Sequence, residues 1–416
     1  MARIFRPILL AAIGLAAAQC RESPPTAPTL ITHLPRELTA AEGRLVATDN
    51  RFAFKLFRQI AESVSADSSL FISPLSVAMA LGMTYNGAAG ATAQEMATAL
   101  ELQDFPLDEL NASYRSLIDL LRGLDGQVAF EIANSIWYRE GWTFEQPFLD
   151  ANRAYFDATV QSLDFKSPTA APTINAWVND RTRGKITSIV DDPLPPDDIM
   201  YLINAIYFKG SWTQQFEASR TRAAPFLLRD GSSATVQMMS TDKPAPVRIS
   251  YRDGVTVLDL PYGGRAFSMT IVLPRSAAAI DSLAANLTAE QWNAWVAGLD
   301  SASLDVSLPK FRFAYDAALK EVLSALGMPH AFCGTWLTDF TRLRAAGDAC
   351  ISKVKHKAFV DVNEEGTEAA AATSVGVGLT SVGQRVTVDR PFLFAIRENL
   401  SGTILFLGRM LRPQVS

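Results

Sequence analysis

The stretch KAFVDVNEEGTEAAAATSVGVGLTSVGQRVTVDR, residues 357–390, decides how the rest of the chain is interpreted. Its two ends predict strands, whereas Glu364, Glu365 and Gly366 are charged and flexible. Residues 367–384 contain no lysine, arginine, proline or aromatic residue, although a plain surface loop usually contains some of these. We therefore expect this segment to do more than connect two strands.

The segment has the residue pattern of a strand with one buried face. Successive side chains of a strand face opposite sides of a sheet. One side is small or apolar throughout: Thr367, Ala369, Ala371, Thr373, Val375, Val377 and Leu379. The other side suits solvent: Glu368, Ala370, Ala372, Ser374, Gly376, Gly378 and Thr380. Composition alone leaves an Ala-rich linker or a short helix as an equal alternative.

Residues 364–372 resemble the hinge of the reactive loop in the serpin family, which combines an acidic residue, a variable one, Gly, Thr, Glu and several alanines. Four other motifs resemble serpin signatures in the same order and spacing: FISPLS at 71–76, NAIYFKGSW at 204–212, LPKF at 308–311 and DRPFLF at 389–394. The chain is thus similar to serpins over almost its whole body. Its N-terminus adds the expectation of an exported, bacterial-type member.

The resemblance implies an α+β serpin fold over residues 39–416. Three β-sheets, eight or nine α-helices and an exposed reactive-centre loop beside a five-stranded central sheet are expected. Cleavage would release the loop to enter the central sheet as an extra strand and trap the protease. The residue pattern also favours an α+β domain, because helical and strand segments are interleaved without a βαβ rhythm.

The predicted hinge has the chemistry that entry into a sheet requires. Small uncharged side chains must enter first, since a buried charge is costly, and Gly366 supplies backbone freedom. Serpins that no longer inhibit often carry proline, charged or bulky residues here. Since none is present, we expect an inhibitor with this hinge: Glu364, Gly366, Thr367, Glu368, Ala369, Ala370, Ala371 and Ala372.

Other site residues are implied by the resemblance. A polar shutter under the central sheet is expected from Ser73, Ser76, Asn204 and His356. As an ordinary buried hydrogen-bond network these residues would look the same. Trp212 matches the aromatic residue at the breach, where the loop first enters, although a plain core tryptophan is the alternative.

The scissile bond is placed at Thr380–Ser381 by counting in the usual serpin register, and a shift of one residue gives Leu379–Thr380. No basic residue precedes either bond and no aromatic residue lies nearby, so a trypsin-like protease is a poor candidate. An elastase-like or subtilisin-like serine protease is expected, and a cysteine protease stays open.

Simple periodicity predicts several elements. Apolar residues at helical spacing follow Asp49 or Asn50, either of which can cap a helix. Helices are also predicted at 75–84 and 91–100, and strands at 128–138, 200–208, 255–260, 267–273, 386–396 and 403–411.

The N-terminus predicts export. Residues 1–20 carry Arg3 and Arg6, an apolar run at 8–18 and then Cys20, the layout of a secretory signal, with a lipoprotein signal at Cys20 left open. Residues 21–38 are Pro-rich and predict an extended tether. A secreted protein, extracellular or periplasmic, or anchored to the envelope through a lipid on Cys20, is expected.

The remaining features limit cofactors and partners. A net charge of −5 without a basic cluster gives no reason to expect nucleic acid or a glycosaminoglycan. Catalytic, phosphate-binding and zinc motifs are missing, so no cofactor and no metal are expected. Cys333 and Cys350 could pair, but two free or buried thiols are favoured.

The expected partner is a target protease held in a covalent acyl complex by a monomer. The main rival is a non-inhibitory serpin that carries a ligand or assists folding. A hydrolase using Ser73 or Ser76 with His356 is the second rival.

Overall fold

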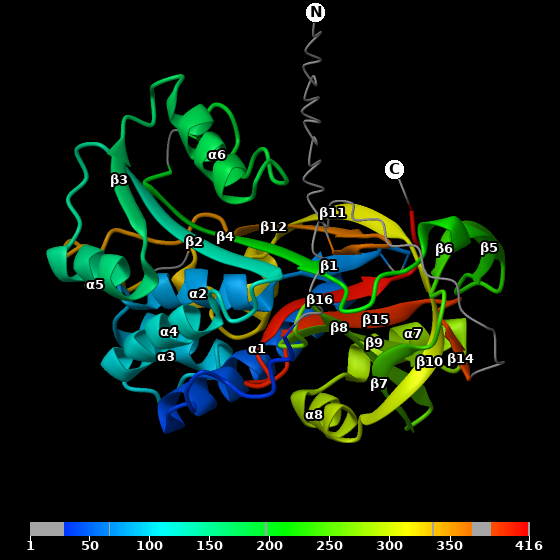
Figure 1. Cartoon of the computed structure of the whole chain (residues 1–416). Coiled ribbons are helices and arrows are strands. Elements are labelled where there is room, and N and C mark those ends of the chain that lie inside the picture. Colours follow the sequence, from blue (N-terminus) through cyan, green and yellow to red (C-terminus); the bar gives the residue numbers. More distant parts are fainter. Residues whose placement is uncertain (1–28, 66, 196–197, 335–336, 368–383, 415–416) are drawn as a thin grey trace, which may run out of the picture.

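The computed structural model describes residues 29–65, 67–195, 198–334, 337–367 and 384–414 (Figure 1). The predicted α+β fold is confirmed. Within these residues the α-helices are α1 (Ala40–Ser63), α2 (Pro74–Tyr85), α3 (Gly90–Ala99), α4 (Leu107–Leu121), α5 (Gln146–Phe156), α6 (Ala170–Arg181), α7 (Ile280–Asn286), α8 (Ala289–Ala297) and α9 (Lys320–Ala325). None of these helices is long and apolar enough to cross a membrane.

The central sheet has six strands rather than the five predicted. Their order is β11 (Phe311–Ala318), β12 (Lys355–Val362), β13 (Gly366–Thr367), β4 (Met200–Ser211), β2 (Val128–Arg139) and β3 (Thr159–Leu163). The additional strand is β13, only two residues long, which lies between β12 and β4. All neighbours are antiparallel except β2 and β3.

The other strands form two sheets that share β10. The first half of β10 pairs with β7, and its last residues pair with β6. One sheet runs β1 (Leu70–Ile72), β16 (Ile404–Met410), β15 (Phe392–Glu398), β9 (Phe267–Pro274), β8 (Val255–Tyr262), β7 (Ala245–Arg252) and β10 (Asp300–Pro309). The other joins β10 to β6 (Ser233–Ser240), β5 (Arg222–Leu227) and β14 (Arg385–Thr387).

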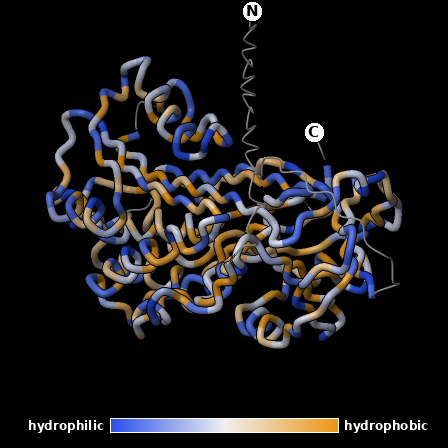
Figure 2. Tube along the Cα trace, viewed as in Figure 1, coloured by the Kyte–Doolittle hydropathy of each residue, from blue (hydrophilic) through white to orange (hydrophobic). Residues whose placement is uncertain are grey.

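Two apolar cores position the central sheet. The larger one joins it to α1, α2 and the C-terminal strands, and hydrophobic residues follow these strands through the middle of the molecule (Figure 2). A smaller core lies between α6 and the opposite face, where Trp137 and Ile203 of the sheet pack with Ile174 and Val178 of the helix. Helix α6 therefore covers the outer face of β2 and β4 (Figure 1).

Helix α1 begins earlier than predicted. Its N-cap is Thr39, whose side chain accepts from the backbone of Glu42, while the Glu42 carboxylate accepts from the Thr39 N–H. This is a capping box. Asp49 and Asn50 lie in the middle of the helix, where Asp49 accepts from the Tyr114 hydroxyl at 2.9 Å, so the predicted cap there is wrong.

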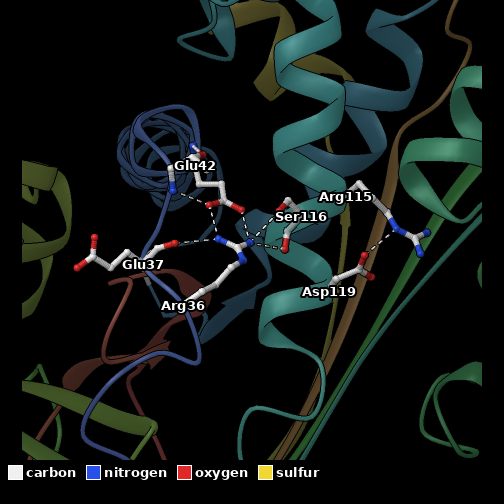
Figure 3. Close-up of polar contacts among 7 residues, drawn as sticks. Arg36, Glu37, Glu42, Arg115, Ser116 and Asp119 are labelled. Atoms are coloured by element: carbon white, nitrogen blue, oxygen red, sulfur yellow. Dashed lines mark hydrogen bonds and ion pairs between the residues drawn. The ribbon is translucent and has the colours of Figure 1, made fainter.

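Residues 29–38, within the predicted tether, contact the folded body. The Ile31 N–H donates to the Gly264 carbonyl at 2.8 Å. Arg36 forms two hydrogen bonds with the carboxylate of Glu42, at 2.8 and 2.5 Å, and one with the Ser116 hydroxyl of α4 at 2.8 Å (Figure 3). The guanidinium of Arg36 lowers the pKa of Glu42 to about 2. The rest of the predicted tether and the predicted signal lie outside the described residues.

Candidate functional site: the hinge and the gap in the central sheet

The predicted hinge joins the central sheet at the C-terminal ends of β12 and β4, where Gly366 and Thr367 form β13. Thr367 pairs with Val362 of β12 on one side and with Gly210 of β4 on the other. Residues 368–383 lie outside the described residues, and with them Glu368, Ala369, Ala370, Ala371 and Ala372 of the predicted hinge and Leu379, Thr380 and Ser381 of the predicted bonds. The described chain resumes at Gln384 and leads into β14, which pairs parallel with β10.

Gly366 is required for a second reason beyond the predicted backbone freedom. A Cβ atom at this position would lie 2.0 Å from the carbonyl oxygen of Gly210. No side chain fits at such a separation, so the close approach of two backbones, besides flexibility, explains the glycine.

The Thr367 side chain enters an aromatic pocket and is 3% exposed. Its Oγ1 is hydrogen-bonded to the hydroxyl of Tyr262 at 2.6 Å. The Tyr262 ring stacks on Trp212 with 4.5 Å between centroids, and the Trp212 Nε1–H donates to the carbonyl of Asn363 at 2.9 Å. Trp212, the predicted breach residue, thus lies beside the point where β13 joins the sheet. Tyr262 was missed, because it lies between the predicted strands 255–260 and 267–273 and no motif marks it.

Glu364 attaches the hinge to the neighbouring sheet. Its carboxylate accepts from Lys310 Nζ at 2.8 Å and from the Thr221 hydroxyl at 2.7 Å. Burial opposes ionisation of this carboxyl, but these two donors outweigh it and lower its pKa. The segment before β13 is therefore held in place by an ion pair as well as by the strand ladder.

The structure brings together the four residues of the predicted shutter. The Ser73 N–H donates to His356 Nε2 at 3.1 Å, and the Ser73 hydroxyl accepts from the Ser76 N–H at 3.3 Å. The Ser76 hydroxyl donates to the carbonyl of Asn204 at 3.5 Å. Since Ser73 and Ser76 lie at the start of α2, His356 on β12 and Asn204 on β4, this cluster joins a helix to both strands that flank β13.

Asn134 extends the cluster and was not predicted. The Asn204 side-chain amide donates to Asn134 Oδ1 at 2.6 Å, and the Asn134 amide donates to the carbonyl of Phe156 at 2.6 Å. These two asparagines are directly opposite each other on β2 and β4. An asparagine among the apolar residues of 128–138 was the signal that could have revealed it.

Acidification should destabilise the native protein through His356. Burial lowers the pKa of this histidine to about 4, and the charge of Asp316 opposes the shift only partly. In the unfolded chain its pKa is near 6.5, so the unfolded chain binds the extra proton between these values, and stability falls as pH drops from about 6.5 to 4. The measurement is the thermal midpoint against pH for the wild type and His356→Asn.

Comparison with the variant is needed because Asp49 acts in the opposite direction. Burial raises the pKa of Asp49 to about 7, so the stability that this residue contributes in its protonated form is lost as pH rises and is regained as pH falls. The variant should lose less stability on acidification than the wild type. Equal losses in the two proteins would contradict the role given to His356.

A cavity of about 90 Å³ lies between the N-terminal ends of β4 and β12, whereas β13 pairs with the C-terminal ends of the same strands. Ser76, Asn204 and His356 of the polar cluster line it together with the apolar side chains of Leu202 and Val354. The polar cluster and the hinge pocket therefore lie along one line, from the entry point of β13 down the gap between the same two strands.

Cys333 and Cys350 form a disulfide, with 5.0 Å between their Cα atoms. The prediction of two free thiols is therefore wrong. Spacing in the sequence allowed both outcomes, and only the fold brings the two residues within bonding distance.

A family model described as Serpin (serine protease inhibitor) matches residues 47–413. Among curated relatives, serpin B10 of Otolemur garnettii is 34% identical over 397 residues, covering 89% of this chain and 99% of the relative. Leukocyte elastase inhibitor of Sus scrofa is 36% identical over 382 residues, covering 89% of this chain and all of the relative. Such relatives are inhibitors rather than enzymes.

These relatives overturn the predicted location. Serpin B10 and the leukocyte elastase inhibitors are intracellular serpins of clade B, not secreted ones. They are animal proteins, so the assignment to an exported bacterial type is not supported either. The expectation of a secreted or envelope-anchored protein, which depended on residues 1–20, is wrong.

Solved structures agree with the family model. Thyroxine-binding globulin in complex with thyroxine superposes with a TM-score of 0.81 at 28% identity, covering 90% of this chain and all of that chain. The thermophilic serpin Tengpin in its native state also superposes with a TM-score of 0.81, at 29% identity, covering 92% of this chain and 97% of that one. By its sequence, its fold and the matched family model, this chain belongs to the serpin family.

Proposed function

We propose that this serpin inhibits an elastase-like or subtilisin-like serine endopeptidase by inserting its cleaved reactive loop into the central sheet. One observation carries the proposal: Gly366 and Thr367 already lie between the C-terminal ends of β12 and β4, and a cavity lies farther along the same two strands, at their N-terminal ends. An extended segment that continues β13 would pass directly into the gap between these strands. The relatives, which are protease inhibitors, support the same activity.

The reaction begins as ordinary proteolysis. The serine Oγ of the protease attacks the carbonyl carbon of Thr380 (or of Leu379), the peptide bond to the next residue breaks, and the new α-amine takes the proton. Thr380 is left as an ester of the protease serine. Insertion of residues 368–380 would then carry the attached protease along the sheet before water hydrolyses the ester.

The side-chain pattern of the loop supports insertion in this register. The side chain of Thr367 faces the aromatic pocket of Trp212 and Tyr262. Residues 369, 371, 373, 375, 377 and 379 share its parity, and they are alanine, threonine, valine or leucine. They would face the apolar core beneath the sheet, while the opposite parity would face outward.

The described site residues take distinct roles in this scheme. Trp212 and Tyr262 form the breach that receives Thr367 of the hinge. Ser73, Ser76, Asn204 and His356 form the shutter, whose hydrogen bonds would rearrange when β4 and β12 part. Glu364 keeps the start of the hinge attached to Lys310 while the strands move.

The residues before the proposed bonds support the choice of target. Val375, Val377 and Leu379 suit a protease with a pocket for small or aliphatic side chains, and the absence of a basic residue argues against an acidic pocket. Several relatives are named for inhibition of leukocyte elastase. The pocket preference inferred from the loop therefore agrees with their names.

Incubation with elastase-like, subtilisin-like and trypsin-like proteases, followed by denaturing electrophoresis, tests the proposal. An elastase-like or subtilisin-like enzyme should form a complex that survives denaturation, and mass spectrometry should find a fragment beginning at Ser381 or Thr380. The same protease without its catalytic serine should form no such complex. Cleavage without a complex by every protease would instead favour a binding module, the activity named for the similar thyroxine-binding globulin.

A further inference from the structure

The disulfide closes a covalent ring, residues 333–350, next to the cavity. Cys333 lies just after the short 3-10 helix Pro329–Ala331, and Cys350 lies shortly before β12. Both cysteines are half-buried rather than enclosed. The ring therefore ends where the chain turns into one of the two strands that must part.

Backbone contacts hold the two ends of the ring side by side in addition to the disulfide. Phe332 and Ile351 form a parallel bridge. The Cys333 N–H donates to the Ile351 carbonyl at 3.0 Å, and the Ile351 N–H donates to the Ala331 carbonyl at 3.0 Å. Without the covalent bond, the two ends would be joined only by noncovalent contacts such as these.

The body of the ring is attached to the helical side of the molecule. The Leu343 N–H donates to the Gly87 carbonyl at 3.0 Å, and the Ala89 N–H donates to the Asp339 carbonyl at 2.9 Å. Gly87 and Ala89 belong to the turn between α2 and α3. The disulfide thus links the chain leading into β12 to a segment that is hydrogen-bonded to the turn between α2 and α3.

The segment after Cys350 forms one wall of the cavity. Cys350, Ile351 and Val354 line it on the side of β12, and Leu202 and Asn204 of β4 line the opposite side. Parting of β12 from β4 must move this wall, because the segment continues directly into β12. A covalent bond from Cys350 to Cys333 restrains that movement.

We propose that the Cys333–Cys350 disulfide is a redox switch that restrains β12, and that its reduction lets β12 part from β4 more readily. This inference rests on the proposed function, because the switch matters only if the sheet opens to receive the loop. A disulfide stabilises a protein mainly through the unfolded chain. Opening of the sheet is a change within the folded protein, which an effect on the unfolded chain does not influence. The disulfide would therefore oppose opening by restraining the wall of the cavity directly.

The switching step is thiol–disulfide exchange. A dithiol reductant attacks one Sγ as a thiolate and forms a mixed disulfide, and the other cysteine leaves as a thiolate. The second thiol of the reductant then closes its own disulfide and releases the first cysteine. Two electrons and two protons pass to Cys333 and Cys350, and the reductant is oxidised.

Hydrogen–deuterium exchange tests the proposal on the full chain carrying Cys20→Ser, so that the ring holds its only cysteines. Dithiothreitol should raise the number of titratable thiols from none to two. Exchange of residues 355–362 should then become at least tenfold faster, while β15 and β16 keep their rate. Cys333→Ala/Cys350→Ala should exchange like the reduced protein and should not respond to the reductant.

Three results would overturn the switch: free thiols before reduction, unchanged exchange in β12, or equally faster exchange in β12, β15 and β16. The last would mean that the bond only supports the whole fold. Melting of the loop-cleaved protein in both redox states separates a failure of the switch from a failure of the proposed function. Faster exchange in reduced β12 without stabilisation by cleavage in either state supports the switch and contradicts loop insertion.

Discussion

Cleavage between Thr380 and Ser381 should raise the thermal midpoint of this protein by tens of degrees. The freed loop would continue β13 between β12 and β4, adding ladder hydrogen bonds worth about 1 kcal/mol each and burying aliphatic side chains worth about 1.5 to 3 kcal/mol each. A dozen inserted residues would together contribute more than about 10 kcal/mol before the entropy of ordering them is subtracted. The measurement is a melt of intact and cleaved protein side by side, with mass spectrometry to locate the cut.

A cut in a different exposed turn provides the control. Arg229 lies at the turn between β5 and β6, far from the hinge in the sequence, and a nick there removes a chain constraint without offering a strand. That nick should leave the midpoint equal or lower. If the loop-cleaved protein also melted at or below the intact protein, the inhibitory interpretation would fail and a non-inhibitory serpin would replace it.

Replacement Thr367→Arg should convert the inhibitor into a substrate. The Thr367 side chain is already buried against Tyr262, and a guanidinium at this place would be buried among aromatic rings at a cost of several kcal/mol (~2–7 kcal/mol even for a neutral polar group). The hinge should therefore leave the sheet, and insertion should become slower than hydrolysis of the ester. Electrophoresis after reaction with the protease should show cleaved chain in place of complex, with the number of inhibitor molecules used per protease rising at least tenfold.

Thr367→Val is the matched control, because it removes only the hydroxyl that is bonded to Tyr262 and keeps the size and branching of the side chain. We expect it to keep forming complex. A complex yield for Thr367→Arg equal to that of wild type would count against insertion of the hinge as the trapping step.

Local patterns predicted much of the scaffold. The alternating apolar residues at 255–260 and 267–273 appear as the paired strands β8 and β9. The start of α1 was missed, because Asp49 and Asn50 resemble caps and the capping box of Thr39 and Glu42 adjoins a Pro-rich stretch. Helix continuity through residues 40–50 depends on packing against other elements, which a local pattern does not report.

The site was predictable only through the family resemblance. Ser73, Ser76 and Asn204 occur in motifs and His356 occupies a matching position, and the structure places all four in one network. Tyr262 and the early pairing of β13 depend on contacts between segments far apart in the chain. The disulfide likewise depends on a distance between Cβ atoms, which spacing along the chain does not determine.

Because the two-residue strand β13 already lies in the sheet, loop insertion would proceed residue by residue from this starting point. In cooperative ordering, the first contacts fix several dihedral angles for little gain, and each later residue adds a bond for one more residue fixed. Since Thr367 is already paired on both sides, nucleation is complete in the uncut protein and only propagation remains. Changes around Tyr262 should therefore alter the fraction of molecules that are ready to insert, whereas changes around Asn204 and His356 should alter how fast the strand lengthens.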